Sequence, residues 1–206
     1  MAWLDARTGY STDVFSRRLD AVGSPSAADA DLGSPLTLVT CLKKDLVLVP
    51  DGTGGALAAW SDHRCDEALG YDIYVLRLGS DGLPLPGWPA NGVAVGSAPG
   101  VQECPSIAPD GGGGVYVIWI DRAPVPDRIF AQHLDAEGVR DPAWPVTGLL
   151  VGTFVAPGAI PSAVSDGAGG CYLAWEGNLF GGRNIRLQRL AAWGARADGW
   201  PDGGVC

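Results

Sequence analysis

The sequence predicts an all-β protein, and more specifically a β-propeller built from four-stranded antiparallel blades. Three observations support this prediction. A unit of about 57 residues occurs four times, each unit alternates glycine-rich turns with apolar runs, and the chain holds 31 Gly, 16 Pro and 8 Trp among 206 residues. Repetition at a fixed period is the most informative of these because it specifies a stacked architecture rather than a single irregular domain.

The first half of each unit is an aspartate turn that leads into a strand. A tryptophan anchors every unit, at Trp3, Trp60, Trp119 and Trp175. An aspartate precedes the last three anchors by nine residues, at Asp51, Asp110 and Asp166. Each aspartate opens a turn of the form DGxGG, whose glycines supply the positive φ angles of hairpin turns. The runs that follow, ALAAW, VYVIW and CYLAW, are apolar at every position, which predicts strands covered on both faces.

The second half of the unit contains the third and fourth strands. The third strand ends in Arg-Leu or His-Leu, with the basic residue at Arg18, Arg77, His133 and Arg189. A Trp-Pro turn follows in three units, at Trp88, Trp144 and Trp200. Four residues further stands a glycine, at Gly92, Gly148 and Gly204. The first unit has Asp29 where the tryptophan is expected, yet Gly33 remains in phase, so this unit is a diverged copy.

Stacking of the units follows from their apolar faces. A four-stranded sheet cannot bury two apolar faces alone, and stacking copies around an axis solves the problem while leaving only short edges. We therefore expect one propeller domain over residues 1–206, with repeats at approximately 1–50, 51–109, 110–165 and 166–206. The first unit lacks its opening strand and the last lacks its closing strand. We expect another copy of the chain, or a missing segment, to complete the ring.

Composition argues against several classes of function. The formal net charge of −9 is unfavourable for nucleic acid, whose affinity rests on basic side chains. No apolar run reaches the roughly 18 residues that cross a bilayer, so no membrane partner is expected. The five cysteines form no CxxC pair, which argues against a zinc site.

The repeat as a whole resembles those of large bacterial surface or secreted β-propeller proteins. The resemblance rests on the pattern DGxGG, WxDxR, DIYxxRL and GWPxxG, which is cleanest from Trp60-Ser-Asp62-His-Arg64 to Arg77-Leu78. The resemblance covers nearly the whole chain. The fourth unit departs from the pattern, with Trp175-Glu-Gly-Asn178 in place of WxDxR. The resemblance implies the propeller fold and an extracellular or cell-surface location, with any export signal outside this chain, but no reaction.

Most repeated polar residues are expected to be structural. An aspartate and an arginine that recur in phase on adjacent strands, such as Asp62 and Arg77 with their counterparts, usually pair within a sheet. One aspartate per DGxGG turn is too few for a convincing calcium site, so we predict no metal and no cofactor, with calcium as the one ion left open. No catalytic set is apparent. Trp88, Trp144 and Trp200 are the candidate ligand-binding residues, because exposed rings on one side of a propeller would stack on sugars or anchor a protein.

Two functions remain after these exclusions. The sequence favours a non-enzymatic binding or scaffold module that holds a glycan or a protein. The alternative is an extracellular, glycosidase-like hydrolase or a fragment of one. A hydrolase requires acidic residues that break the repeat, and neither of the two main departures, residues 24–45 and 176–182, shows a persuasive acid pair.

Overall fold

The computed structural model describes the chain except for residues 8, 10, 26–31, 40, 65–69, 123–124, 180–181 and 193–195. The described residues form fourteen β-strands and no helix, which confirms the all-β class. Accordingly, this part of the chain contains no helix long and apolar enough to span a membrane.

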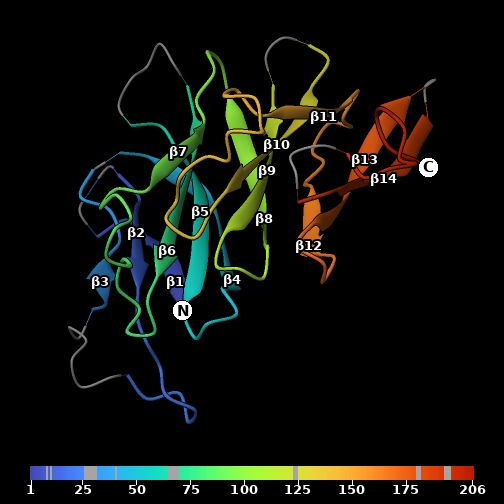
Figure 1. Ribbon diagram of the computed structural model, residues 1–206. Coiled ribbons are helices and arrows are strands. Elements are labelled where there is room, and N and C mark those ends of the chain that lie inside the picture. Colours follow the sequence, from blue (N-terminus) through green and yellow to red (C-terminus); the bar gives the residue numbers. More distant parts are fainter. Residues whose placement is uncertain are drawn as a thin grey trace.

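The strands form four antiparallel sheets that follow one another in chain order (Figure 1). Sheet 1 consists of β1 (Ala2–Asp5), β2 (Asp13–Ser16) and β3 (Ser34–Pro35). Sheet 2 consists of β4 (Lys43–Pro50), β5 (Ala56–Asp62), β6 (Asp72–Leu78) and β7 (Val93–Gly96). Sheet 3 consists of β8 (Gln102–Pro109), β9 (Val115–Asp121), β10 (Arg128–Leu134) and β11 (Leu149–Thr153). Sheet 4 consists of β12 (Ser162–Ser165), β13 (Cys171–Leu179) and β14 (Gly182–Leu190).

The sheets do not begin at the predicted repeat boundaries. Each DGxGG turn joins the first strand of a sheet to its second, so sheet 2 begins at Lys43, eight residues before Asp51. Sheets 2 and 3 have the predicted four strands. Among the described residues sheets 1 and 4 have three strands each, and at the fourth position of sheet 4 there is only an isolated bridge between Leu187 and Val205.

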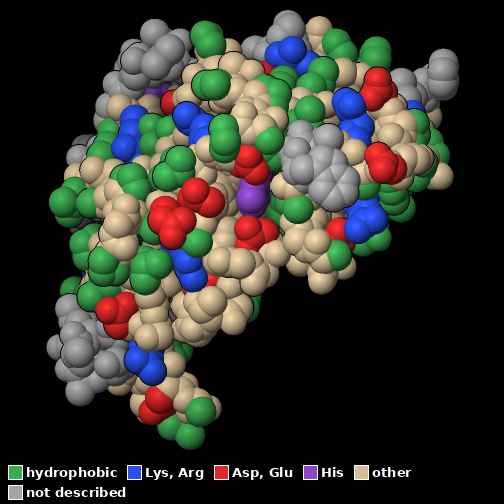
Figure 2. Space-filling model, viewed as in Figure 1, with side chains coloured by type: hydrophobic (Ala, Val, Ile, Leu, Met, Phe, Trp, Pro, Cys, Tyr) green, Lys and Arg blue, Asp and Glu red, His purple; other side chains and the backbone are tan. Residues whose placement is uncertain are grey.

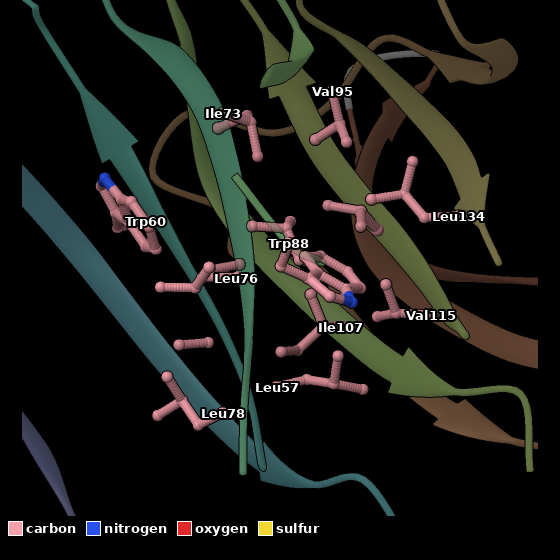
Figure 3. Packing of buried hydrophobic residues seen from close by; sticks show 14 of the residues in the cluster. Leu57, Trp60, Ile73, Leu76, Leu78, Trp88, Val95, Ile107, Val115 and Leu134 are labelled. Carbon is pink, nitrogen blue, oxygen red and sulfur yellow. The ribbon is translucent and has the colours of Figure 1, made fainter. Parts of the chain in front are cut away.

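Neighbouring sheets pack face to face through two apolar clusters. The first cluster joins sheets 1, 2 and 3, and its largest buried side chains include Trp60, Leu57 and Leu76. Figure 3 shows Trp88 of this cluster beside Ile107 and Val115, which belong to the next sheet. The second cluster joins sheet 3 to sheet 4. Strands β5 and β9 are thus buried on both faces, which explains why their sequences do not alternate.

The repeated glycines exist because the anchor tryptophans lie against the backbone. A Cβ placed on Gly148 would lie 2.6 Å from Cη2 of Trp119, and one placed on Gly92 would lie 2.9 Å from the same atom of Trp60. The preceding sheet contributes a second contact, since a Cβ on Gly96 would lie 2.8 Å from Trp119. Trp119 is therefore held between a glycine of its own sheet and a glycine of the sheet before it.

This contact predicts a large cost for adding one methyl group. Gly148→Ala should destabilise the protein by about 2–4 kcal/mol, because the new Cβ overlaps the Trp119 ring and the backbone φ is +89°. Gly87→Ala is the matched control: its φ is +99° but no atom lies within 4 Å of its Cβ position, so only the backbone term of about 1 kcal/mol applies. Urea unfolding of both variants measures the difference, and equal losses would contradict the proposed contact.

Candidate functional site

The aspartates of the DGxGG turns stabilise the turns and tie them to the third strand. Oδ1 of Asp51 accepts hydrogen bonds from the backbone amides of Thr53 and Gly55, at 2.8 and 2.9 Å. Its Oδ2 accepts from Nε of Arg77 at 2.9 Å. Asp166 pairs with Arg189 in the same way, and in sheet 3 His133 takes the place of the arginine, with Nε2 lying 3.0 Å from Asp110.

The aspartate two residues after the anchor tryptophan accepts a hydrogen bond from the indole. Nε1 of Trp60 donates to Asp62 at 2.9 Å, and Arg64 pairs with the same carboxylate at 3.2 Å while its guanidinium lies 3.5 Å from the centre of the Tyr74 ring. Trp3 and Asp5 form the same bond in sheet 1, also at 2.9 Å. These pairs lie within one sheet, and their arrangement is structural.

The Trp-Pro rings do not have the exposure that ligand stacking requires. Trp88 is 6% exposed and Trp144 is 4% exposed, so the prediction of exposed rings is wrong for these two. Nε1 of Trp88 donates to the carbonyl oxygen of Ala136 in the next sheet at 3.0 Å. Trp200 in sheet 4 is half-buried. The sequence prediction failed because the flanking Gly and Pro suggested a poorly covered loop, whereas the neighbouring sheet covers it.

The first strands of sheets 2, 3 and 4 are neighbours in space, with β8 packed between β4 and β12. Near the start of β4 and of β8 the register shifts by a bulge, after Lys44 and after Glu103. The residue inside each bulge has a positive φ, 56° at Asp45 and 55° at Cys104. Bulges re-aim side chains and are concentrated near functional sites.

Charged side chains from both strands meet at these bulges. Glu103 is the centre of the group, because one carboxylate oxygen accepts from Nζ of Lys44 and the other accepts from Nε of Arg122. Arg122 also pairs with Asp127. Asp45 accepts from the backbone amide of Cys104 at 3.2 Å. We call Lys44, Asp45, Glu103, Arg122 and Asp127 the bulge cluster.

Aromatic side chains border the bulge cluster. Nζ of Lys44 lies 4.4 Å from the centre of the Tyr71 ring, and His63 meets the same ring edge-on with 5.2 Å between the ring centroids. Both aromatic residues lie where the β5–β6 connection approaches the start of β4. The cluster therefore combines two cations, three carboxylates and an aromatic wall in one place.

The ion pairs fix the charge states in the bulge cluster. Burial alone would raise the pKa of Glu103, but the hydrogen bonds from Lys44 and Arg122 outweigh it and lower that pKa. For Lys44, burial lowers the pKa and the bond to Glu103 raises it by more, so the net direction is upward. Glu103 is thus held ionised, and Lys44 is held protonated.

A second polar feature lies between sheets 2 and 3. A pocket of about 210 Å³ is lined by Gln102, Trp119, Asp121 and Arg128 among others. Gln102 is buried there, and its side-chain amide has no partner among the described residues. The pocket holds one carboxylate, which Arg128 already pairs at 2.8 Å, so it does not offer the two carboxyl groups that acid–base chemistry on a glycan requires.

The bulge cluster was not predicted from the sequence, although two features of the sequence indicate it. In the third unit the anchor is followed by Ile-Asp-Arg, so Arg122 directly follows the aspartate and pairs with Glu103 instead of Asp121. Lys44 and Glu103 occupy equivalent positions in consecutive units, and their side chains have opposite charges. Asp45 falls within the departure at residues 24–45, which holds no acid pair by itself because the second carboxylate of the cluster, Glu103, belongs to the next sheet.

Other chemistry is limited in the described part of the chain. No group of three or more His, Cys, Asp or Glu residues there could hold a metal ion. Cys104, Cys171 and Cys206 are free thiols, and burial raises the pKa of Cys171 to about 12, which makes it unreactive. On the face shown in Figure 2, acidic and basic side chains lie in small mixed groups rather than in a continuous stripe.

Comparison with known proteins identifies no family but does find a similar fold. No family model and no curated protein matches the chain. The chain is similar to a thermostable family-43 glycoside hydrolase at a TM-score of 0.51 and 14% identity, covering 100% of this chain and 74% of that one. An endo-arabinase from Bacteroides thetaiotaomicron aligns with a TM-score of 0.44 and 14% identity over 92% of this chain and 70% of its own. An endo-1,5-α-L-arabinanase from Thermotoga petrophila aligns with a TM-score of 0.46 and 20% identity, and the chain spans 51% of it.

The similarity to the family-43 glycoside hydrolase corrects the functional prediction. The sequence favoured a non-enzymatic binding or scaffold module, whereas the solved structure whose fold the chain shares is a glycoside hydrolase. The preference for a module rested on the lack of a visible acid pair, and the bulge cluster removes that reason.

The ionisation of Asp51 should make the free energy of unfolding depend on pH. Burial would raise its pKa, but hydrogen bonds from Thr53, Arg77 and Gly55 lower it to about 2, below the value of about 3.9 in an unfolded chain. The carboxylate therefore contributes about 2 kcal/mol above pH 4, and the contribution is lost as the pH falls from about 4 to about 2. Urea unfolding of the wild type and Asp51→Asn should show a free-energy difference that shrinks over that range. A difference independent of pH would contradict this account.

The fourth unit can be tested by restoring what it lacks. Nε1 of Trp175 is buried without an acceptor among the described residues, because Gly177 stands where the other sheets have Asp62 and Asp121. A Cβ on Gly177 would lie 2.9 Å from Oδ1 of Asn184, so that side chain must rotate away, while Nε of Arg186 at 3.7 Å is close enough to balance the new charge. With that adjustment Gly177→Asp should stabilise the protein by about 1–2 kcal/mol. Gly177→Ala adds a Cβ without an acceptor and is the control. Equal unfolding midpoints for the two variants would show that the missing acceptor is not the cause.

Proposed function

We propose that the four sheets are consecutive blades of a β-propeller and that the chain is a glycoside hydrolase, or part of one, acting at the bulge cluster. The observation that carries this proposal is the hydrogen bond from the amide of Cys104 to Asp45, which brings Asp45 beside the residue that follows Glu103 where adjacent first strands begin. The similarity in fold to a family-43 glycoside hydrolase supports it. A polysaccharide substrate also fits the extracytoplasmic setting that the repeat resemblance implies.

Glycoside hydrolysis requires two carboxyl groups with different roles. One protonates the leaving oxygen, and the other activates water or stabilises the positive charge that develops on the sugar ring. Glu103 suits the second role, because Lys44 and Arg122 keep it ionised. Asp45 has backbone and hydroxyl donors, the amide of Cys104 and Oγ of Ser61 at 2.9 Å, but no ion pair within the described residues, and it is the proposed proton donor.

The remaining groups of the cluster would bind the substrate. Lys44 and Arg122 are donors that can reach sugar hydroxyls, and Tyr71 offers a ring face of the kind that stacks on sugars. Asp127 shares Arg122 with Glu103 and so positions the guanidinium. In this assignment the repeated Asp–Arg pairs remain structural, and chemistry is confined to residues that differ between units.

The proposal predicts which substitutions remove activity. The wild-type chain should release sugar from at least one member of a panel of arabinan, xylan and nitrophenyl glycosides. Glu103→Gln and Asp45→Asn should each lower kcat/KM by at least about 100-fold, since each removes one of the two carboxyl roles. Glu137→Gln, at an exposed turn of sheet 3, is the matched control and should leave turnover unchanged.

Folding of each variant is checked by near-ultraviolet circular dichroism, because Glu103 also holds two ion pairs. Wild-type protein that cleaves no glycoside in the panel would overturn the proposal. So would a folded Glu103→Gln variant with wild-type turnover.

A further inference from the structure

Sheet 4 leaves uncovered a face that is covered in sheets 2 and 3. Ile185, Leu187 and Tyr172 point to this face and are 61%, 42% and 39% exposed. The residues at the same repeat positions are fully buried, namely Ile73 and Ile129, Val75 and Ala131, and Leu57 and Tyr116. The run CYLAW in β13 is also apolar throughout, like the doubly covered strands β5 and β9. The amino-acid sequence of sheet 4 is therefore that of a sheet with a neighbour on both sides.

Sheet 1 lies at the opposite end of the row (Figure 1), and its other face is the less covered one. Leu19 is 38% exposed, whereas Leu78, Leu134 and Leu190 at the same position are buried. Trp3 is half-buried, whereas Trp60 and the other anchors are buried. In sheets 2 and 3 these positions are covered by the preceding sheet, so sheet 1 lacks a preceding sheet just as sheet 4 lacks a following one.

Sheets 1 and 4 each carry one half of a contact that is complete between sheets 2 and 3. Between sheets 2 and 3, the Trp88 ring packs on Gly138 and its Nε1 donates to Ala136, both in the turn Asp135-Ala136-Glu137-Gly138. Sheet 1 has the nearly identical turn Asp20-Ala21-Val22-Gly23, which no ring occupies: no atom lies within 4 Å of a Cβ placed on Gly23.

The unoccupied turn has the same conformation as the occupied one. Gly23 and Gly138 have φ of 83° and 78°. Asp20 accepts from the amides two and four residues later, and Asp135 does the same. The remaining half of the contact is Trp200 in sheet 4, which is half-buried where Trp88 is buried.

We infer that the occupant of the open face of sheet 4 is sheet 1 of a second copy of this chain. The copies associate head to tail, with Trp200 of one seated on the Gly23 turn of the other and Ile185 and Leu187 covered by the partner. Such a contact is heterologous: it joins two different surfaces and closes into a ring when the rotation between copies permits.

Light scattering during size-exclusion chromatography tests the association. The 206-residue chain should be dimeric or larger over about 1–100 µM, with a mass that rises with concentration. The double variant Ile185→Glu, Leu187→Glu and the single variant Leu19→Glu should each be monomeric, since each buries charge in one half of the contact. Val125→Glu, at an apolar position that is 86% exposed away from both faces, is the control and should associate like the wild type.

Mixing the two monomeric variants tests the head-to-tail geometry. The Leu19→Glu variant keeps an intact sheet 4, and the double variant keeps an intact sheet 1, so an equimolar mixture should form a one-to-one dimer through the single remaining intact contact. A contact between like faces would give no complex in this mixture. A wild-type chain that stays monomeric at 100 µM overturns the proposal and assigns the face to another segment. Association that survives both sets of substitutions overturns it as well.

Discussion

The packing of each anchor tryptophan on a glycine of its own sheet, joined for Trp119 and Trp175 by a glycine of the preceding sheet, is the contact on which the rest of the structure depends. Trp119 lies against Gly148 of its own sheet and Gly96 of the preceding one, and neither position has room for a Cβ. The ring therefore sets the distance and the lateral register between adjacent sheets. Because the sheets are held in this register, the starts of β4 and β8 come side by side, and the bulge cluster can form there.

Repeated and non-repeated polar residues have different roles. Polar residues that recur, such as Asp51 with Arg77, are satisfied by partners in the same sheet, and they stabilise turns and strand ends. Polar residues that differ between units find partners in the neighbouring sheet, as Lys44 does with Glu103. The recurring polar groups already have hydrogen-bond partners. We therefore expect catalytic or binding sites at repeat positions whose residues differ between units.

The all-β class and the antiparallel sheets could be predicted from the sequence because the repeat is local. The spacing from Asp51 to Trp60, the DGxGG turns and the unbroken apolar runs all concern residues close in the chain. Their interpretation as hairpins was confirmed, and double coverage was confirmed for β5 and β9 but not for β13, where Tyr172 is exposed. The candidate site could not be predicted in this way. Lys44 and Glu103 are 59 residues apart, and only the stacking of sheets brings them together. The exposure of Trp88 was misjudged for the same reason, since the residues that cover it belong to the next unit.

The alternation of glycine and tryptophan along the chain also bears on how such a protein can change in length. Gly96 and Gly152 each lie against the tryptophan of the following sheet, so each of these two units contributes a glycine to the unit after it. Duplication or loss of one whole unit would recreate the same junction at the new boundary. A gain or loss of part of a unit would leave a tryptophan side chain without the glycine on which it packs. Duplication or deletion of whole units is therefore compatible with this scaffold, whereas a change that interrupts the contact between units is not.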